Sequence, residues 1–295
     1  MSFASEVKSE LCRDAVGSRT LAVAECCGVM LFCHTFTQRE IRVVTASESL
    51  SERLPRIIKR ASGVQTQPAS RVGGRYVYAL TDPEQIARVF AALDIDAKRA
   101  LSHHINLGLL EDPGCREAFL RGAFLAGGSV TDPAKSYHLE LSTAHYSVSR
   151  ECAALLADMG FAPREITRGG NYVLYYKRSE VIEDLLSTLG ATNAAMRVME
   201  AKVEKSMTNT VNRKVNCDAA NVDKTVAAAQ AQLDAIRRID RDYGLDTLPE
   251  PLQQAALLRF ANPEVSLTDL AKLSYPPVSR STLSYRLKKL MEYGK

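Results

Sequence analysis

The segment REAFLRGAFLAGGS, residues 116–129, has a counterpart in the segment LAVAECCGVMLFCH, residues 21–34. Both are rich in small and apolar residues, both predict a helix, and both carry a glycine at an equivalent internal position, Gly122 and Gly28. A glycine inside a helix costs about 0.5–1 kcal/mol relative to alanine, so two equivalent glycines call for a packing reason. Because a missing Cβ lets two backbones approach closely, we expect these helices to pack on each other across a pseudo-twofold axis.

The duplication extends beyond these two helices. Gly-Gly pairs at 73–74 and 169–170 are each followed by an alternating segment, RYVYAL and NYVLYY. Gly-Gly suits a tight hairpin turn, and the alternation predicts strands with one buried face. With further extended segments at 42–45 and 137–143, each half reads as αββαββα. The sequence therefore predicts an α+β domain over residues 1–195 with a saddle-like pair of antiparallel sheets, in which repeat 1 spans about 18–95 and repeat 2 about 115–190.

The last third of the chain is expected to be all-α. The polar segment 196–222 indicates a linker that passes from helix to loop, and a helical domain is expected over 223–295. Its first helix is predicted at 225–240, which is rich in alanine and could be capped by Asn221 or Asp223. The next is predicted at 252–260, between Pro-rich flanks that favour a helix start and stop.

Residues 266–292 have the pattern of a helix-turn-helix. Ser266 and Asp269 form a start similar to a capping box, Pro276-Pro277 ends this first helix, and Ser279 can cap a second one. Leu283, Leu287 and Leu290 form the inner face of that second helix. Two short helices joined by a tight connection place the second in the DNA major groove, although a merely structural hairpin has a similar pattern. The candidate DNA-binding residues are Ser279, Arg280, Ser281, Thr282, Ser284, Tyr285, Arg286, Lys288 and Lys289.

The distribution of charge favours the DNA-binding interpretation. The 295 residues carry a net charge of +4, which is too small to be informative by itself. Six basic and two acidic residues lie within 266–295, so the whole excess belongs to the last 30 residues. A basic segment with helical periodicity is the electrostatic footprint expected of a nucleic-acid-binding helix, although a solvated helix face is the commoner cause of local charge.

Composition excludes several other classes of protein. The chain is 46% hydrophobic and 24% charged, which excludes collagen-like and wholly disordered chains. No apolar run approaches the roughly 18–20 residues of a membrane helix, and the polar N-terminus lacks a signal segment, so a cytoplasmic location is expected. The seven cysteines form no CxxC pair and the five histidines no metal-binding spacing, so no metal or other cofactor is expected.

The segment FLRGAFLAGGSV, together with the duplicated αββαββα unit, resembles the LAGLIDADG homing endonucleases. In that family an acidic residue near the end of each motif helix holds the catalytic metal. The corresponding positions here are Cys33 and Gly127, and neither can replace a carboxylate toward Mg²⁺. The resemblance therefore implies a nuclease-like scaffold without the nuclease chemistry, and we expect the chain not to be an enzyme.

Nearly the whole chain resembles the WhiA family of bacterial regulators. The resemblance rests on FASEVKSEL, AFLRGAFLAGGSV, NRKVNCDAANVDKTV, and the ANPEVSLTDLA, PPVSRS and YRLKKL segments of the C-terminal region. It implies a nucleoid-associated transcriptional regulator that binds double-stranded promoter DNA and is involved in cell division, chromosome segregation and, in sporulating relatives, sporulation septation. It also implies, for actinobacterial members, a WhiB-type iron–sulfur protein as partner. Residues 281–285 read STLSY where the family commonly has SGVNH, so the family's DNA target does not carry over.

The sequence is also compatible with two other functions. The chain could be a scaffold of the division machinery for which DNA binding is incidental, in which case residues 266–295 would be dispensable in the cell. It could also be an active LAGLIDADG endonuclease, against which Cys33 and Gly127 argue.

Overall fold

The computed structural model describes residues 2–95 and 102–294. Interatomic contacts divide the chain into two compact units, residues 1–205 and 206–295. Among the described residues, none of the helices combines the length and the apolar character needed to cross a bilayer.

The first unit contains the expected duplication. Repeat 1 consists of α2 (Arg19–Phe32), β1 (Thr35–Phe36), β2 (Ile41–Thr45), α3 (Glu48–Ser62), β3 (Ser70–Val72), β4 (Arg75–Leu80) and α4 (Pro83–Ala92). Repeat 2 consists of α5 (Pro113–Gly127), β5 (Gly128–Val130), β6 (Leu139–Thr143), α6 (Tyr146–Asp158), β7 (Arg164–Arg168), β8 (Asn171–Tyr176) and α7 (Ser179–Leu189). Each repeat is αββαββα, so the predicted α+β fold class is confirmed.

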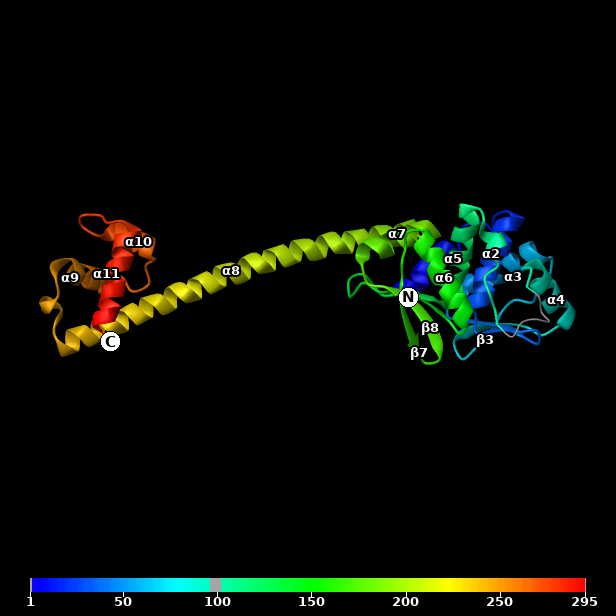
Figure 1. The fold of residues 1–295 in the computed structure, drawn as a ribbon, viewed down its shortest axis with the longest axis horizontal. Coiled ribbons are helices and arrows are strands. Elements are labelled where there is room, and N and C mark those ends of the chain that lie inside the picture. The colour runs from blue at the N-terminus through cyan, green and yellow to red at the C-terminus, as the bar shows by residue number, and fades with distance from the viewer. Residues whose placement is uncertain (1, 96–101, 295) are drawn as a thin grey trace. The chain divides into compact units, whose positions relative to one another are not determined.

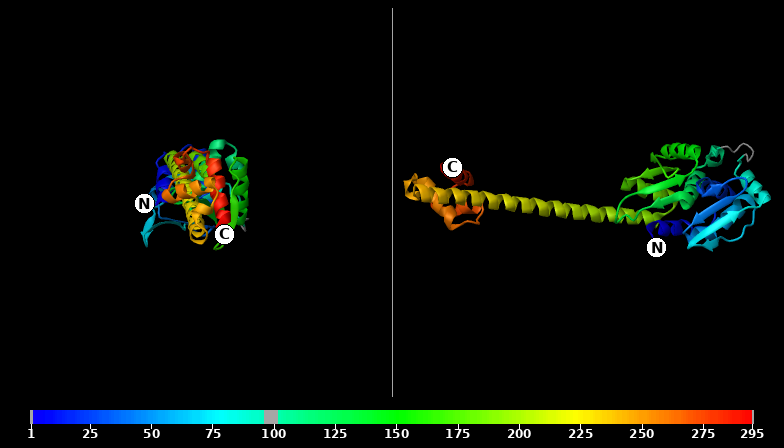
Figure 2. Two further views of the ribbon diagram at one scale, coloured as in Figure 1. Left: turned by 90° about the vertical axis from the view of Figure 1, so that its left-hand side faces the viewer. Right: turned by 90° about the horizontal axis from the view of Figure 1, so that it is seen from below.

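The two repeats form two antiparallel sheets with the same topology. The strand orders are β1-β2-β4-β3 and β5-β6-β8-β7. Figure 1 shows the helices of this unit on one side of the strands, and the right-hand view of Figure 2 shows both sheets. Both Gly-Gly pairs have positive φ in two-residue hairpin turns, where the flanking residues Val72 and Arg75, and Arg168 and Asn171, are paired. The hairpin prediction is therefore confirmed.

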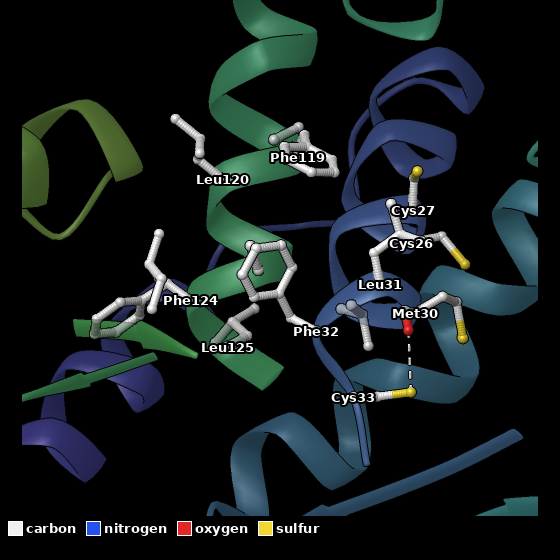
Figure 3. Packing of buried hydrophobic residues seen from close by; sticks show 14 of the residues in the cluster. Cys26, Cys27, Met30, Leu31, Phe32, Cys33, Phe119, Leu120, Phe124 and Leu125 are labelled. Carbon is white, nitrogen blue, oxygen red and sulfur yellow. Dashed lines mark hydrogen bonds between the residues drawn. The ribbon is translucent and has the colours of Figure 1, made fainter. Parts of the chain in front are cut away.

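Helices α2 and α5 pack directly against each other in the core of the first unit (Figure 3). A Cβ on Gly28 would overlap with the backbone oxygen of Phe119, and one on Gly122 with the backbone oxygen of Glu25. Around this crossing lie buried side chains from both helices, among them Met30, Phe32, Phe119, Phe124 and Leu125. The expected close approach of the two glycine-containing helices is thus present.

A buried ion pair lies beside this crossing. Arg53 of α3 donates to both carboxylate oxygens of Glu25 of α2, with N–O distances of 2.8 and 2.9 Å, and also to the backbone oxygen of Asp14. The two side chains are 1% and 3% exposed. Because a buried charge is costly unless it is paired and hydrogen bonded, this pair ties α2 to α3.

Helix α1 (Phe3–Leu11) packs on α3 and α5 and contacts the start of α8 (Thr192–Asp242). The Glu10 carboxylate accepts hydrogen bonds from the backbone N–H groups of Asn193 and Ala194 at 2.7 and 3.1 Å. N–H groups in the first turn of a helix have no partner within the helix, and a negative charge there is also favoured by the helix dipole. A short 3-10 helix, Leu107–Leu110, precedes α5.

The expected change from helix to loop within 196–222 is wrong, because α8 (Thr192–Asp242) is one continuous helix that includes this whole segment. The physical reason is the absence of glycine and proline between Thr192 and Tyr243, so nothing in the backbone breaks the helix. Asn221 and Asp223 consequently lie inside the helix and do not cap one. Gly244, with positive φ, follows the end of the helix.

The second unit has its own small core. The last turns of α8 are followed by a 3-10 turn (Leu245–Thr247), α9 (Glu250–Ala261), α10 (Leu267–Leu273) and α11 (Arg280–Tyr293). The apolar faces of these elements meet in one cluster, which includes Ile236, Ile239, Leu252, Ala256, Leu270, Leu283, Leu287 and Leu290.

Candidate nucleic-acid interface

Helices α10 and α11 begin at the serines that the sequence indicates. The Ser266 hydroxyl accepts a hydrogen bond from the Asp269 N–H at 3.2 Å and lies 2.8 Å from the Asp269 carboxylate. That carboxylate also pairs with Lys272 at 2.8 Å, and these two bonds hold its pKa below the ordinary value, with Lys272 as the larger cause. The Ser279 hydroxyl accepts from the Thr282 N–H at 3.1 Å. Both starts therefore use the capping predicted from the sequence.

The inner face of α11 anchors the helix in the small core. Leu283, Leu287 and Leu290 are buried to at least 99% and pack with Leu270 and Ala271 of α10. Six residues, Ser274–Ser279, connect the two helices, and the Val278 N–H donates to the Ala271 oxygen at 3.3 Å. The opposite face of α11 is thereby fixed outward on a short, supported helix.

Most of the predicted DNA-contacting side chains lie on this outward face. Among the predicted residues, the exposed ones are Ser279, Arg280, Ser281, Thr282, Ser284, Tyr285, Lys288 and Lys289, whereas Arg286 is partly buried. No acidic residue occurs between Asp269 and Glu292. The exposed face of α11 is therefore basic and hydroxyl-rich along its first ten residues. Lys295, which belongs to the basic segment, lies outside the described residues.

Some of these side chains already have local partners. Ser279 Oγ and Thr282 Oγ1 are 2.8 Å apart, so the two hydroxyls share one hydrogen bond at the start of α11. Lys289 Nζ lies 5.6 Å from the centroid of the Tyr285 ring, which is a cation–π contact on the solvent side. These contacts restrict the rotamers of Thr282 and Tyr285 before any ligand binds.

Two further residues of this region were not identified from the sequence. Tyr275, in the connection between α10 and α11, is 93% exposed. The two prolines that follow it place it in a turn, and this pattern is the sequence signal for its exposure. Arg259 of α9 is 1% exposed and donates through one nitrogen to three backbone oxygens of the α9–α10 connection, most closely to that of Val265 at 2.8 Å. Burial lowers the pKa of Arg259. No sequence pattern distinguishes this buried arginine from an exposed one.

The two positions that correspond to the nuclease acids lie at the ends of α2 and α5. Cys33 is buried, and its Sγ lies 3.2 Å from the backbone oxygens of both Met30 and Thr35; the contact with Met30 is drawn in Figure 3. Burial raises the pKa of the Cys33 thiol to about 12. A Cβ on Gly127 would overlap with the backbone oxygen of Ser142, so a carboxylate has no room there without rearrangement. Within the described residues, no three His, Cys, Asp or Glu side chains are grouped so that they could hold a metal ion.

A duplicated αββαββα unit together with a capped helix-turn-helix defines a LAGLIDADG-like helix-turn-helix protein. Comparison with family models agrees: residues 116–208 match the WhiA LAGLIDADG-like domain and residues 211–293 match the WhiA C-terminal HTH domain. The chain belongs to the WhiA family.

Relatives and solved structures extend this match to nearly the full length. Proteins named "Probable cell division protein WhiA" are 31% identical in Clostridium botulinum (strain Hall), covering 98% of this chain and 96% of the relative, and 34% identical in Ruminiclostridium cellulolyticum, covering 99% and 96%. The crystal structure of full-length DUF199/WhiA from Thermatoga maritima has a TM-score of 0.60 at 26% identity and covers 100% of this chain and 98% of its own. The N-terminal LAGLIDADG domain of DUF199/WhiA matches with a TM-score of 0.50 at 25% identity, covering 64% of this chain and 92% of its own.

Proposed function

We propose that the chain is a sequence-specific DNA-binding protein that regulates transcription of genes used in cell division and chromosome segregation. The observation that carries this proposal is the outward face of α11, where exposed basic, hydroxyl and aromatic side chains lie opposite three buried leucines. A recognition helix needs this combination, because its inner face must be held rigidly while its outer face enters the major groove.

The side chains on α11 divide into two roles. Arg280, Ser281, Thr282, Ser284 and Tyr285 occupy the first two turns, which reach base edges in helix-turn-helix complexes. Lys288 and Lys289 lie further along and suit phosphates, and Arg286, being partly buried, is the weakest candidate for a direct DNA contact. The Ser279 hydroxyl occupies the Thr282 N–H, and the other N–H groups of the first turn suit a phosphate, which is a common way to position such a helix.

We propose further that the LAGLIDADG-like unit does not cleave DNA. The Cys33 thiol is engaged with backbone oxygens, and Gly127 has no space for a side chain. Incubation of the full chain with plasmid or with its selected DNA site in the presence of Mg²⁺ or Mn²⁺ should therefore produce neither nicks nor breaks. Metal-dependent cleavage that stays with the chain through successive purification steps would contradict this.

The proposal also includes three properties that the resemblance to the WhiA family implies. They are a cytoplasmic, nucleoid-associated location, a link to sporulation where the organism sporulates, and a WhiB-type iron–sulfur protein as partner. Imaging of a fluorescent fusion tests the first of these, because the signal should overlap with the nucleoid and should become diffuse when Lys288 and Lys289 are replaced by alanine.

Chromatin immunoprecipitation with sequencing of the full chain is the decisive experiment. We expect peaks at a limited set of promoters that share one motif, and the loss of these peaks in an Arg280→Ala variant that is expressed at the normal level. If the chain were a division scaffold with incidental DNA binding, occupancy would be diffuse and cells would divide normally after removal of residues 266–295. Normal division in that truncation would reject the proposed function.

A further inference from the structure

A hollow of about 570 Å³ lies in the second unit, beside the ends of α8 and α11. These two ends are close together, since a Cβ on Gly294 would be 2.8 Å from the backbone oxygen of Ala235 (Figure 1). The volume is within the range of pockets that bind ligands. The lining residues come from the end of α8, the segment that leads into α9 and the end of α11, and are Ile239, Tyr243, Thr247, Leu248, Pro249 and Tyr293.

Two of the lining residues are tyrosines whose rings are open to solvent. Tyr243 is 71% exposed and Tyr293 is 55% exposed, whereas Ile239 and Leu248 are buried. Neither tyrosine hydroxyl is hydrogen bonded to another residue that the structure describes, and neither ring has an aromatic or cation–π contact with one. Tyrosine combines an apolar ring with a polar end, and it is enriched at protein interfaces for this reason. The hollow therefore offers two unengaged rings to a ligand.

The charged groups around the hollow are mainly acidic. Residues 239–250, which supply five of the six lining residues, carry four acids and one base. The base, Arg241, is paired with Asp242 at 2.7 Å. No basic residue is among the described lining residues, and Lys289, one turn before the end of α11, contacts the ring of Tyr285 instead. The exposed acids of this region that have no ion-pair partner within residues 2–95 and 102–294 are Asp240, Asp246 and Glu292.

The backbone adds to this negative potential, because two helices end at the hollow. Helix α8 ends at Asp242 and α11 ends at Tyr293. The last carbonyl groups of a helix have no partner within the helix and carry the negative end of its dipole. The backbone oxygens of Arg241 and Asp242 accept no hydrogen bond from the described part of the chain. The positive end of α9 is offset by the Glu250 carboxylate in its first turn, so the hollow favours a cation.

From these observations we propose that the hollow is a docking site for a basic, apolar segment of another protein, in which arginine or lysine lies next to leucine or proline. The leucine or proline packs against Leu248 and Pro249, as in other aromatic-lined grooves that bind peptides. The cation lies over a tyrosine ring, close to the free carboxylates and the helix ends. Nucleic acid does not suit the hollow, because the same charges repel phosphates.

This site is separate from the DNA-contacting residues proposed on α11 and does not depend on them. Tyr293 lies eight residues after Tyr285, which is about 12 Å along the helix. The residues proposed to reach bases occupy the first two turns of α11, whereas the hollow is at the other end. A docked segment therefore leaves the first turns of α11 free for DNA.

The test uses three synthetic peptides and the full chain, with binding measured by calorimetry at low and high salt. The peptide GPRLPRLPG has the proposed chemistry, GPELPELPG reverses its charge, and GSRSSRSSG keeps the charge without the apolar residues. Tyr243→Ala/Tyr293→Ala removes both rings of the hollow. The matched control is Tyr146→Ala/Tyr275→Ala, which removes two exposed rings that do not line it. Asp246→Asn/Glu292→Gln removes charge only, and circular dichroism melts show whether each variant is folded.

We expect GPRLPRLPG to bind the natural chain saturably and at least tenfold more tightly than either other peptide. Its affinity should fall at least tenfold in the variant without the rings of the hollow, at least threefold in the charge variant, and less than twofold in the control. If the variant without those rings fails to fold, the charge variant decides, because it changes two exposed side chains only.

Three results would overturn the proposal: equal affinities for the three peptides, no saturable binding of any of them, or an unchanged affinity in the folded Tyr243→Ala/Tyr293→Ala variant. Sedimentation velocity distinguishes a further occupant. Self-association of the natural chain that this variant abolishes would assign the hollow to a second copy of the chain and would reject a separate partner.

Discussion

At the scale of single residues, Arg280 and Lys288 allow base contacts to be separated from phosphate contacts. A bidentate arginine–guanine contact contributes about 1–3 kcal/mol of discrimination, whereas a phosphate contact contributes equally to every sequence. Arg280→Ala should therefore reduce the preference for the selected site over scrambled DNA. Lys288→Ala should weaken both DNAs alike and reduce the slope of log affinity against log salt by about one. Fluorescence anisotropy at several salt concentrations measures both quantities.

Arg241→Ala is a suitable control for these two variants, because Arg241 is exposed on α8 and is paired with Asp242. Its DNA affinity should stay within twofold of the natural chain. If Arg280→Ala kept its full preference for the selected site, the assignment of Arg280 to a base would be wrong. The sequence predicted that α11 would carry these residues, but it gave no indication that Thr282 and Tyr285 would be held by Ser279 and Lys289.

The buried pair of Glu25 and Arg53 gives a prediction about stability. Removing one partner of a buried ion pair leaves an unpaired charge and costs about 3–5 kcal/mol. Glu25→Gln should lower the free energy of unfolding by this amount in denaturant titrations of the full chain. Glu25→Leu/Arg53→Met, which removes both charges, should be much closer to the natural chain. Equal destabilisation in the two variants would show that lost packing, and not the unpaired Arg53 charge, dominates.

At the scale of elements, the crossing of α2 and α5 explains why glycine occupies position 122. A methyl group there would meet the Glu25 backbone oxygen, and overpacking of this kind costs about 1–3 kcal/mol. We therefore expect Gly122→Ala to lower the thermal midpoint of the first unit. Gly114→Ala in the first turn of the same helix is the matched control, because its added Cβ would be 3.5 Å from Leu21, an ordinary contact. The prediction fails if both variants have the same thermal midpoint.

The start of α6 gives a prediction about pH. His145 precedes this helix without a side-chain cap, and its ring centroid is 4.5 Å from that of His103. Burial, with a smaller effect of His103, lowers the pKa of His145 from 6.5 to about 4, and burial also lowers the pKa of His103. A lowered pKa means that the unfolded chain takes up protons more readily. Stability from this group is therefore complete above pH 6.5 and is lost as the pH falls towards 4.

His145→Asn should reduce that loss, because asparagine does not titrate and is a favourable N-cap residue before α6. Thermal midpoints between pH 7.5 and 5 should fall less steeply for His145→Asn than for the natural chain. His34→Asn, at an exposed histidine, should follow the natural chain. Parallel pH profiles for all three proteins would show that His145 is not responsible.

The elements also show what the sequence could and could not establish. The duplication can be predicted from the sequence, because local geometry requires its glycines. Gly28 and Gly122 allow a close approach of two helix backbones, and the Gly-Gly pairs of the two hairpins have positive φ. The secondary structure of residues 196–222 could not be predicted in the same way, because a polar composition is typical of both a loop and an exposed helix. Only the absence of helix-breaking residues favours the helix that forms. The ion pair of Glu25 and Arg53 and the buried Arg259 depend on distant parts of the chain and leave no local pattern.

At the scale of the whole molecule, the excess positive charge and the smaller of the two cores belong to the same unit. The net charge of +4 belongs entirely to the residues after 265, within the unit that carries α10 and α11. Most buried apolar side chains of the described residues belong to one of two separate clusters, one in each unit. DNA affinity should therefore depend more on the integrity of the small second core, which holds α11 through Leu283, Leu287 and Leu290, than on that of the large first core.

Separate cores predict that heat unfolds the chain in two transitions, since each cooperative unit melts according to its own packing. Truncating a buried leucine costs about 2–5 kcal/mol in the core to which it belongs. Leu287→Ala should therefore lower the midpoint of one transition and abolish specific DNA binding at temperatures above it. Leu125→Ala should lower the midpoint of the other transition and leave DNA affinity unchanged while the second unit stays folded. Differential scanning calorimetry with parallel anisotropy measurements tests this, and a single transition that both variants shift equally would show that the two cores unfold as one cooperative unit.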